Sequence, residues 1–159
     1  MQFFTAAGAI VLALCGLEGA RRLNKSAEDD VSGALAYLLL ISYVRSQIDK
    51  YALPIGEIFQ GCSRELLFSC GWRKEECPRS TEELFSCCKI NDKEARRIIS
   101  EFCSDFGRSY RDEELRRCDS SIAALKRCNE RLCGEVTNKK KLNLTLCLSG
   151  SLALIILLI

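Results

Sequence analysis

Cysteine is the residue type through which this chain could do chemistry, because its 159 residues include eleven cysteines and no histidine. Between the apolar ends of the chain, no two cysteines form the C-x-x-C spacing of zinc and redox sites. We therefore predict no metal and no cofactor, and we interpret most of these thiols as small buried apolar groups. The nine cysteines concerned are Cys62, Cys70, Cys77, Cys87, Cys88, Cys103, Cys118, Cys128 and Cys133.

The sequence also lacks the side-chain combinations that common catalytic mechanisms use. The lack of histidine removes the commonest general base and the usual activator of a serine or cysteine nucleophile. The sequence also lacks the glycine-rich motifs that bind phosphate groups. Its paired carboxylates fall at predicted helix starts or in a connector, and the helix dipole is enough to explain those in a first helical turn. These pairs are Asp29/Asp30, Glu75/Glu76, Glu82/Glu83 and Glu113/Glu114. We predict that the protein is not an enzyme and has no catalytic residues.

The charge balance argues against nucleic acid as a partner. The chain has 23 basic and 21 acidic residues, for a formal net charge of +2. Proteins that bind single strands interleave aromatic and basic residues, and no such stretch occurs here.

Two apolar segments without any charge stand at the ends of the chain, Phe3–Leu17 and Leu142–Ile159. A helix rises about 1.5 Å per residue, so a helix of the length of Leu142–Ile159 just crosses a hydrocarbon core of roughly 30 Å. We predict transmembrane helices over residues 1–20 and 142–159, with a helical domain of residues 21–141 between them.

Basic clusters mark the inner ends of both segments and set the orientation. By the positive-inside rule these clusters lie on the cytoplasmic side, so the central domain is predicted to be cytoplasmic. The predicted membrane-junction residues are Glu18, Arg21, Arg22, Lys139, Lys140 and Lys141.

An alternative interpretation places the protein outside the cell. The first segment would then be a cleaved signal and the last a signal for a lipid anchor. Asn24-Lys25-Ser26 and Asn143-Leu144-Thr145 would be glycosylation sequons. This describes a secreted, cysteine-rich, lipid-anchored surface protein. The state of the cysteines distinguishes the two, since a cytoplasmic domain would keep them free and a secreted one would pair them.

The apolar residues between the ends follow a helical period almost everywhere, which predicts an all-α bundle. We expect Ser26 to cap a helix that begins at Ala27 and contains a buried apolar stretch, Gly33–Val44. Short helices are expected after Pro54 and over Glu65–Cys70.

Capping boxes mark the next two helices, at Ser80–Glu83 and at Asn91–Glu94. The second of these helices is strongly amphipathic and is expected to end at Gly107. A long helix is predicted over residues 109–137, leading to the three lysines. Its exposed charges make Arg116, Arg117, Arg127 and Arg131 candidates for docking an acidic partner surface.

The chain resembles the stage III sporulation protein AB family of endospore-forming Firmicutes over essentially its full length. The resemblance lies in short motifs and in the apolar helix that closes the chain. The motifs are Gly16-Leu17-Glu18 followed by Arg21-Arg22, Ile48-Asp49-Lys50-Tyr51 before Pro54-Ile55-Gly56-Glu57, and Phe102–Gly107. The family pattern often continues with an aspartate soon after this glycine. Here Asp112 comes later, and Phe106, Gly107 and Asp112 are the candidate contact residues.

The resemblance implies a non-enzymatic subunit of a secretion-like channel complex between mother cell and forespore. It implies an outer forespore membrane location, with the central domain in the mother-cell cytoplasm. The implied partners are the secretion-type ATPase stage III sporulation protein AA and the other channel subunits, and self-association stays open. A regulatory membrane adaptor unrelated to spores would share the same topology.

Overall fold

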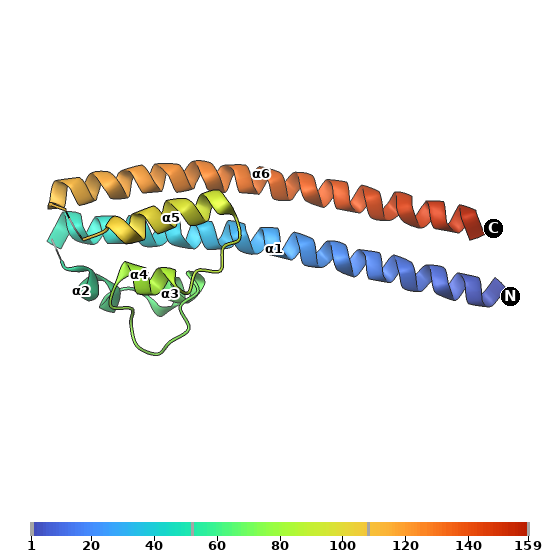
Figure 1. Ribbon diagram of the computed structural model, residues 1–159, viewed down its shortest axis with the longest axis horizontal. Helices are drawn as coiled ribbons and strands as arrows, with labels where there is room; N and C mark the ends of the chain where they lie inside the picture. The colour runs from blue at the N-terminus through green and yellow to red at the C-terminus, as the bar shows by residue number, and fades with distance from the viewer. Residues whose placement is uncertain (1, 52, 108, 159) are drawn as a thin grey trace. The chain divides into compact units, whose positions relative to one another are not determined.

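The computed structural model describes the backbone of residues 2–51, 53–107 and 109–158, and the side chains of residues 18, 21, 24–51, 53–107, 109–143, 145–146 and 149–150. Within these ranges the chain is all-helical and has no strand, which confirms the all-α prediction (Figure 1). The helices are α1 (Gln2–Tyr51), α2 (Ile55–Gln60), α3 (Arg64–Ser69), α4 (Thr81–Phe85), α5 (Lys93–Asp105) and α6 (Arg111–Leu158).

The chain divides into two compact units. Asp29–Leu132 forms one, which we call the helical domain. Met1–Glu28 together with Cys133–Ile159 forms the other, which we call the terminal unit. Helices α1 and α6 each contribute residues to both units.

In the helical domain, α1 and α6 run antiparallel. Arg45 of α1 contacts Asp119 of α6, whereas Asp49, further along α1, contacts Arg111 at the start of α6. Helix α5 lies alongside both helices, and α2–α4 with their connecting loops gather next to α1 (Figure 1).

Helix α1 supplies the centre of the core, because its side chains at helical spacing are almost completely buried. Ala34, Tyr37, Ile41 and Val44 are each at most 1% exposed. Burial of a side chain such as isoleucine or valine contributes about 1.5–3 kcal/mol. The predicted buried stretch Gly33–Val44 is therefore confirmed on this face of the helix.

Part of α1 has the length and apolar composition of a membrane-spanning helix. Among the described residues, Asn24–Tyr51 is long and apolar enough to cross a membrane, judged by length and composition alone. Its middle part packs into the core of the helical domain, as a core helix of the same composition would.

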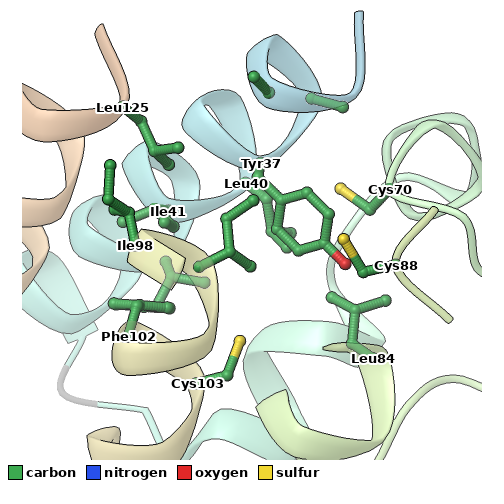
Figure 2. Packing of buried hydrophobic residues seen from close by; sticks show 14 of the residues in the cluster. Tyr37, Leu40, Ile41, Cys70, Leu84, Cys88, Ile98, Phe102, Cys103 and Leu125 are labelled. Atoms are coloured by element: carbon green, nitrogen blue, oxygen red, sulfur yellow. The ribbon is translucent and has the colours of Figure 1, made fainter. Parts of the chain in front are cut away.

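Sulfur atoms surround the hydroxyl group of Tyr37. Cys70 and Cys88 point toward this hydroxyl, and Leu84 lies beside it (Figure 2). The hydroxyl oxygen is buried beside the Cys88 thiol. The side chains around the ring come from α1, α4, α5 and the segments next to α3 and α4, so this cluster joins most of the domain.

The nine described cysteines are all free, and most of them are buried, as the composition suggested. Burial raises the pKa of Cys103 and of Cys118 to about 12. It also raises the pKa of Cys70. These thiols stay protonated at neutral pH and are therefore poor nucleophiles. Cys133 is the one described cysteine that is exposed.

The sequence placed some helix ends correctly and others wrongly. The hydroxyl of Ser80 accepts from Glu83 N at 3.1 Å, as the predicted capping box requires. Gly107 follows the end of α5 with a φ of 82°, which only glycine adopts easily. The cap of α5 is Asp92, which accepts from Ala95 N at 2.9 Å, so the box assigned to Asn91–Glu94 was one residue out of register.

The predicted outer bounds of α1 and α6 were wrong. Helix α1 does not begin at Ala27, since it runs from Gln2, and α6 continues past Thr137 to Leu158. Ser26 and Thr137 lie inside these helices. A serine or threonine in a helix interior costs only a fraction of a kcal/mol, and no proline interrupts either helix.

Polar contacts join the two helices in the terminal unit. Asn143 Nδ2 donates to Asn24 Oδ1 at 2.8 Å, and Lys140 Nζ lies 2.6 Å from Glu28 Oε1. Most side chains of the predicted transmembrane helices, residues 1–20 and 142–159, lie outside the described residues, so these spans stay predictions. Of the predicted junction residues, Glu18, Arg21, Lys139, Lys140 and Lys141 are exposed, and the side chain of Arg22 lies outside the described residues.

We predict a graded reactivity of the thiols. In the folded full chain, a soluble thiol reagent should modify Cys133 fastest and the half-buried Cys77 and Cys87 more slowly. Cys70, Cys103 and Cys118 should react only after denaturation, because they are buried and protonated. Mass spectrometry of time points would measure this order. Rapid modification of Cys118 in the native protein would contradict the core described above.

Candidate functional site

Helix α5 is the element that shapes the candidate site. Its apolar side is buried against the core through Ala95, Ile98, Ile99, Phe102 and Cys103. The opposite side of this 13-residue helix carries charged residues. This division follows from the apolar spacing of three and four residues that the sequence shows.

Arg131 of α6 holds the N-terminal end of α5. Its Nη2 lies 2.9 Å from both carboxylate oxygens of Asp92, and its Nε lies 3.2 Å from Glu94 Oε2. Burial opposes ionisation of Asp92, but hydrogen bonds from Ala95 N and from the Arg131 guanidinium outweigh it. The pKa of Asp92 is therefore held below its usual range. Asp92 thus both caps α5 and ties it to α6.

Arg117 of α6 holds the C-terminal end of α5. Its guanidinium donates to the backbone carbonyl of Asp105, the last residue of α5, and lies near the hydroxyl of Ser109. It also forms ion pairs with Glu113 at 3.9 Å and with Glu114 at 3.6 Å. Helix α5 is therefore fastened to α6 at both ends, in an antiparallel arrangement.

Glu114 fixes the turn between α5 and α6. Its side chain is only 7% exposed, and its Oε1 accepts from Gly107 N and Ser109 N at 3.1 Å each. Its Oε2 is buried without a partner in the described part of the chain. Sequence analysis explained Glu114 by the helix dipole and missed this role. No local signal separates Glu114 from the exposed Glu113 beside it.

A groove remains between α5 and α6, with a volume of about 260 Å³. Its lining is mixed, with more polar than apolar surface: Ile98, Phe102 and Ala124 contribute the apolar part, and the small side chains of Ser120 and Ser121 of α6 leave space. The remaining lining residues are Arg97, Glu101 and Asp105 of α5 and Arg117 of α6.

The four arginines predicted as docking residues fall into two pairs. Arg117 and Arg131 are engaged with α5, as described above. Arg116 and Arg127 are exposed, and neither has an ion pair among the described residues. Arg116 and Arg127 lie eleven positions apart, which is about three helical turns and places both on one face of α6. Ser120 and Ala123 are the exposed residues between them on this face.

The other predicted contact residues lie near the end of α5. The ring of Phe106 packs on Phe102, with ring centroids 5.0 Å apart and planes at 47°. Gly107 is exposed and donates its amide to Glu114, and Asp112 is exposed in the first turn of α6. The structure therefore brings Gly107 close to the groove end that Asp105 lines. Whether Phe106, Gly107 and Asp112 bind a partner stays a prediction.

Binding is the chemistry that this arrangement can support. Among the described side chains, no group of three or more His, Cys, Asp or Glu residues could hold a metal ion. The groove offers a mixed lining of apolar, small and charged residues, and Arg116 and Arg127 are exposed on the neighbouring face of α6. Such surfaces suit a protein partner.

Comparison with known proteins decides the family. The family model for stage III sporulation protein AB matches residues 36–159. The chain belongs to the stage III sporulation protein AB family. The matched residues include α5, the groove and all of α6, so the surface described here lies inside the family region. No curated protein and no solved structure matches the chain.

The alternative of a secreted, lipid-anchored protein finds no support from the described residues. Its nine described cysteines are unpaired, and the two asparagines of the sequons bond to each other through their side chains. An asparagine side chain engaged in this way, in a half-buried position, is a poor glycosylation acceptor.

The two pairs of arginines should differ in their effect on stability. We predict that Arg131→Ala lowers the free energy of unfolding of the full chain by about 1–2 kcal/mol, because it leaves the half-buried Asp92 without its charged donor. Arg127→Ala should change it by less than about 0.5 kcal/mol, as for an exposed residue without an ion pair. Denaturant unfolding in detergent, followed by circular dichroism, measures both. Equal effects would contradict the assignment.

The lowered pKa of Asp92 predicts an acid sensitivity. A carboxylate with a lowered pKa in the folded state stabilises the fold above its ordinary pKa of about 4, and this stability is lost as the pH falls through the lower folded value. Asp92→Asn keeps a good helix cap but removes the charge. The variant should be less stable than the wild type at pH 7, and the difference should shrink below about pH 4. An unchanged difference across this pH range would contradict the ion-pair role.

Proposed function

We propose that this protein is a membrane-anchored, non-enzymatic subunit of the stage III sporulation complex. In this proposal its helical domain lies in the mother-cell cytoplasm, at the outer forespore membrane, and docks the secretion-type ATPase stage III sporulation protein AA. Membership of the family supports a role in this complex. The docking role, the partner and the location are the parts that we add.

The observation that carries the docking role is the groove between α5 and α6. Between these two helices the domain keeps an open groove of mixed polarity, and two exposed arginines, Arg116 and Arg127, lie on the neighbouring face of α6. Its two ends are fixed by ion pairs of Arg117 and Arg131, the first of them with the buried Glu114. A surface maintained in this way is best explained by a binding partner.

Helix α6 suggests how docking would act on the membrane part. The helix carries one wall of the groove and continues unbroken to Leu158, inside the last apolar segment. We propose that conformational changes of the ATPase are passed along this helix. An unbroken helix resists bending far better than a loop, because every turn is fixed by backbone hydrogen bonds.

Co-purification tests the docking proposal. The full chain and its cognate ATPase would be produced together, extracted in mild detergent and isolated through a tag on the chain. We expect the ATPase to be retained and its rate of ATP hydrolysis to change on addition of the purified chain. Absence of both effects would contradict docking of this ATPase.

A helix break tests the transmission step separately. Insertion of Gly-Pro after Thr137 interrupts α6 but leaves the groove residues unchanged. We expect this variant to retain the ATPase and to form few heat-resistant spores, while an insertion of two alanines, which preserves helical structure, is the control for added length. Normal sporulation with the Gly-Pro insertion would contradict transmission through α6.

A further inference from the structure

Beyond the identity of the partner, the outer face of α6 indicates the chemistry that the partner must have. We propose that Arg116, Ser120, Ala123 and Arg127 bind an acidic α-helix that lies along α6 and presents two carboxylates about three turns apart. We call these four residues the arginine face. This inference deepens the proposed docking function. It depends on that proposal only where it identifies the partner as the ATPase.

The spacing of the two arginines defines the spacing of the carboxylates. Eleven residues of helix correspond to about 16 Å along the axis and to about three whole turns. The two guanidinium groups therefore project from one side of α6. A second helix has the same periodicity, so acidic residues eleven positions apart on it would meet both arginines.

Small residues between the arginines favour a helix over other partners. Ser120 and Ala123 are exposed and leave the backbone of α6 accessible between the two cations. Ser120 also lines the groove between α5 and α6, so the arginine face and the groove are continuous. Helices pack closely where the ridge of one fits the groove of the other.

The surrounding charges argue against a membrane or a nucleic acid as the occupant. Asp112 lies one turn before Arg116, and Glu130 lies one turn after Arg127. Both carboxylates are exposed and have no ion pair among the described residues. An extended anionic surface would be repelled at both ends of the arginine face. A helix with two central carboxylates has charges complementary to the two arginines. Basic residues near the ends of that helix would be complementary to Asp112 and Glu130.

The pattern also disfavours pairing of this face with itself. In an antiparallel pair centred on the arginine face, Arg116 would meet Arg127 of the second copy, and like charges would face each other at both positions. The occupant is therefore a different helix rather than a second copy of this one.

Charge reversal in the full chain tests the inference. Arg116→Glu combined with Arg127→Glu should weaken binding of the cognate ATPase by roughly 100-fold, since two attractions become repulsions. Lys89→Glu combined with Lys93→Glu makes the same change in net charge at exposed residues outside the arginine face and should leave binding within about threefold. Binding should also weaken with rising salt. Equal loss in both variants, or no loss in either, would overturn the inference.

A synthetic probe separates this inference from the proposed function. The probe is a cross-linked helical peptide with two glutamates eleven positions apart, compared with an isomer that carries them on opposite faces. We expect the full chain to bind the first peptide and to prefer it clearly over the isomer. A peptide with lysines in place of the glutamates should bind the charge-reversed variant. If the ATPase fails to bind while the peptides behave as expected, the proposed partner is wrong and the arginine face stands. Equal binding of the two glutamate peptides overturns it.

Discussion

The attachment of α5 to α6 at both ends is the constraint on which the rest of the site depends. Arg117 and Arg131 lie fourteen positions apart on α6, a distance of about 21 Å along the helix. Helix α5 has 13 residues and is therefore about 20 Å long. The two guanidinium groups thus match the length of α5. One meets its last carbonyl and the other meets its capping aspartate, so neither end of α5 can slide along α6 without losing a charged hydrogen bond.

This fastening explains why a groove can persist between two packed helices. Small residues on α6 opposite α5 would normally let the helices close together, which would remove the space. Here the distance is fixed at the ends, and Ile98 and Phe102 turn their apolar groups into the core below the groove. Tyr37 and its surrounding sulfur atoms hold the opposite side of that core (Figure 2). The same fastening engages Arg117 and Arg131, whereas Arg116 and Arg127 stay exposed and have no ion pair among the described residues.

Much of the fold could be predicted from the sequence, because its signals are local. The 3.6-residue period predicted α5 and its buried face, Ser80 and Gly107 marked helix ends, and the buried state of most cysteines followed from their chemistry. The long extents of α1 and α6 were missed, since Ser26 and Thr137 favour helix ends only weakly. The division of the arginines could not be predicted. Arg116 and Arg117 are neighbours in the chain, and their roles differ through tertiary contacts of Arg117 such as the one with the carbonyl of Asp105, twelve residues earlier.

Amide hydrogen exchange on the full chain tests the central claim most directly, by comparing two double variants. In Arg117→Ala/Arg131→Ala, we expect the amides of Lys93–Asp105 to lose protection strongly, because α5 is then released at both ends. In Arg116→Ala/Arg127→Ala, the same amides should keep the protection of the wild type. Equal protection of α5 in the two variants would contradict the division of the four arginines into a pair that holds α5 and a pair that does not.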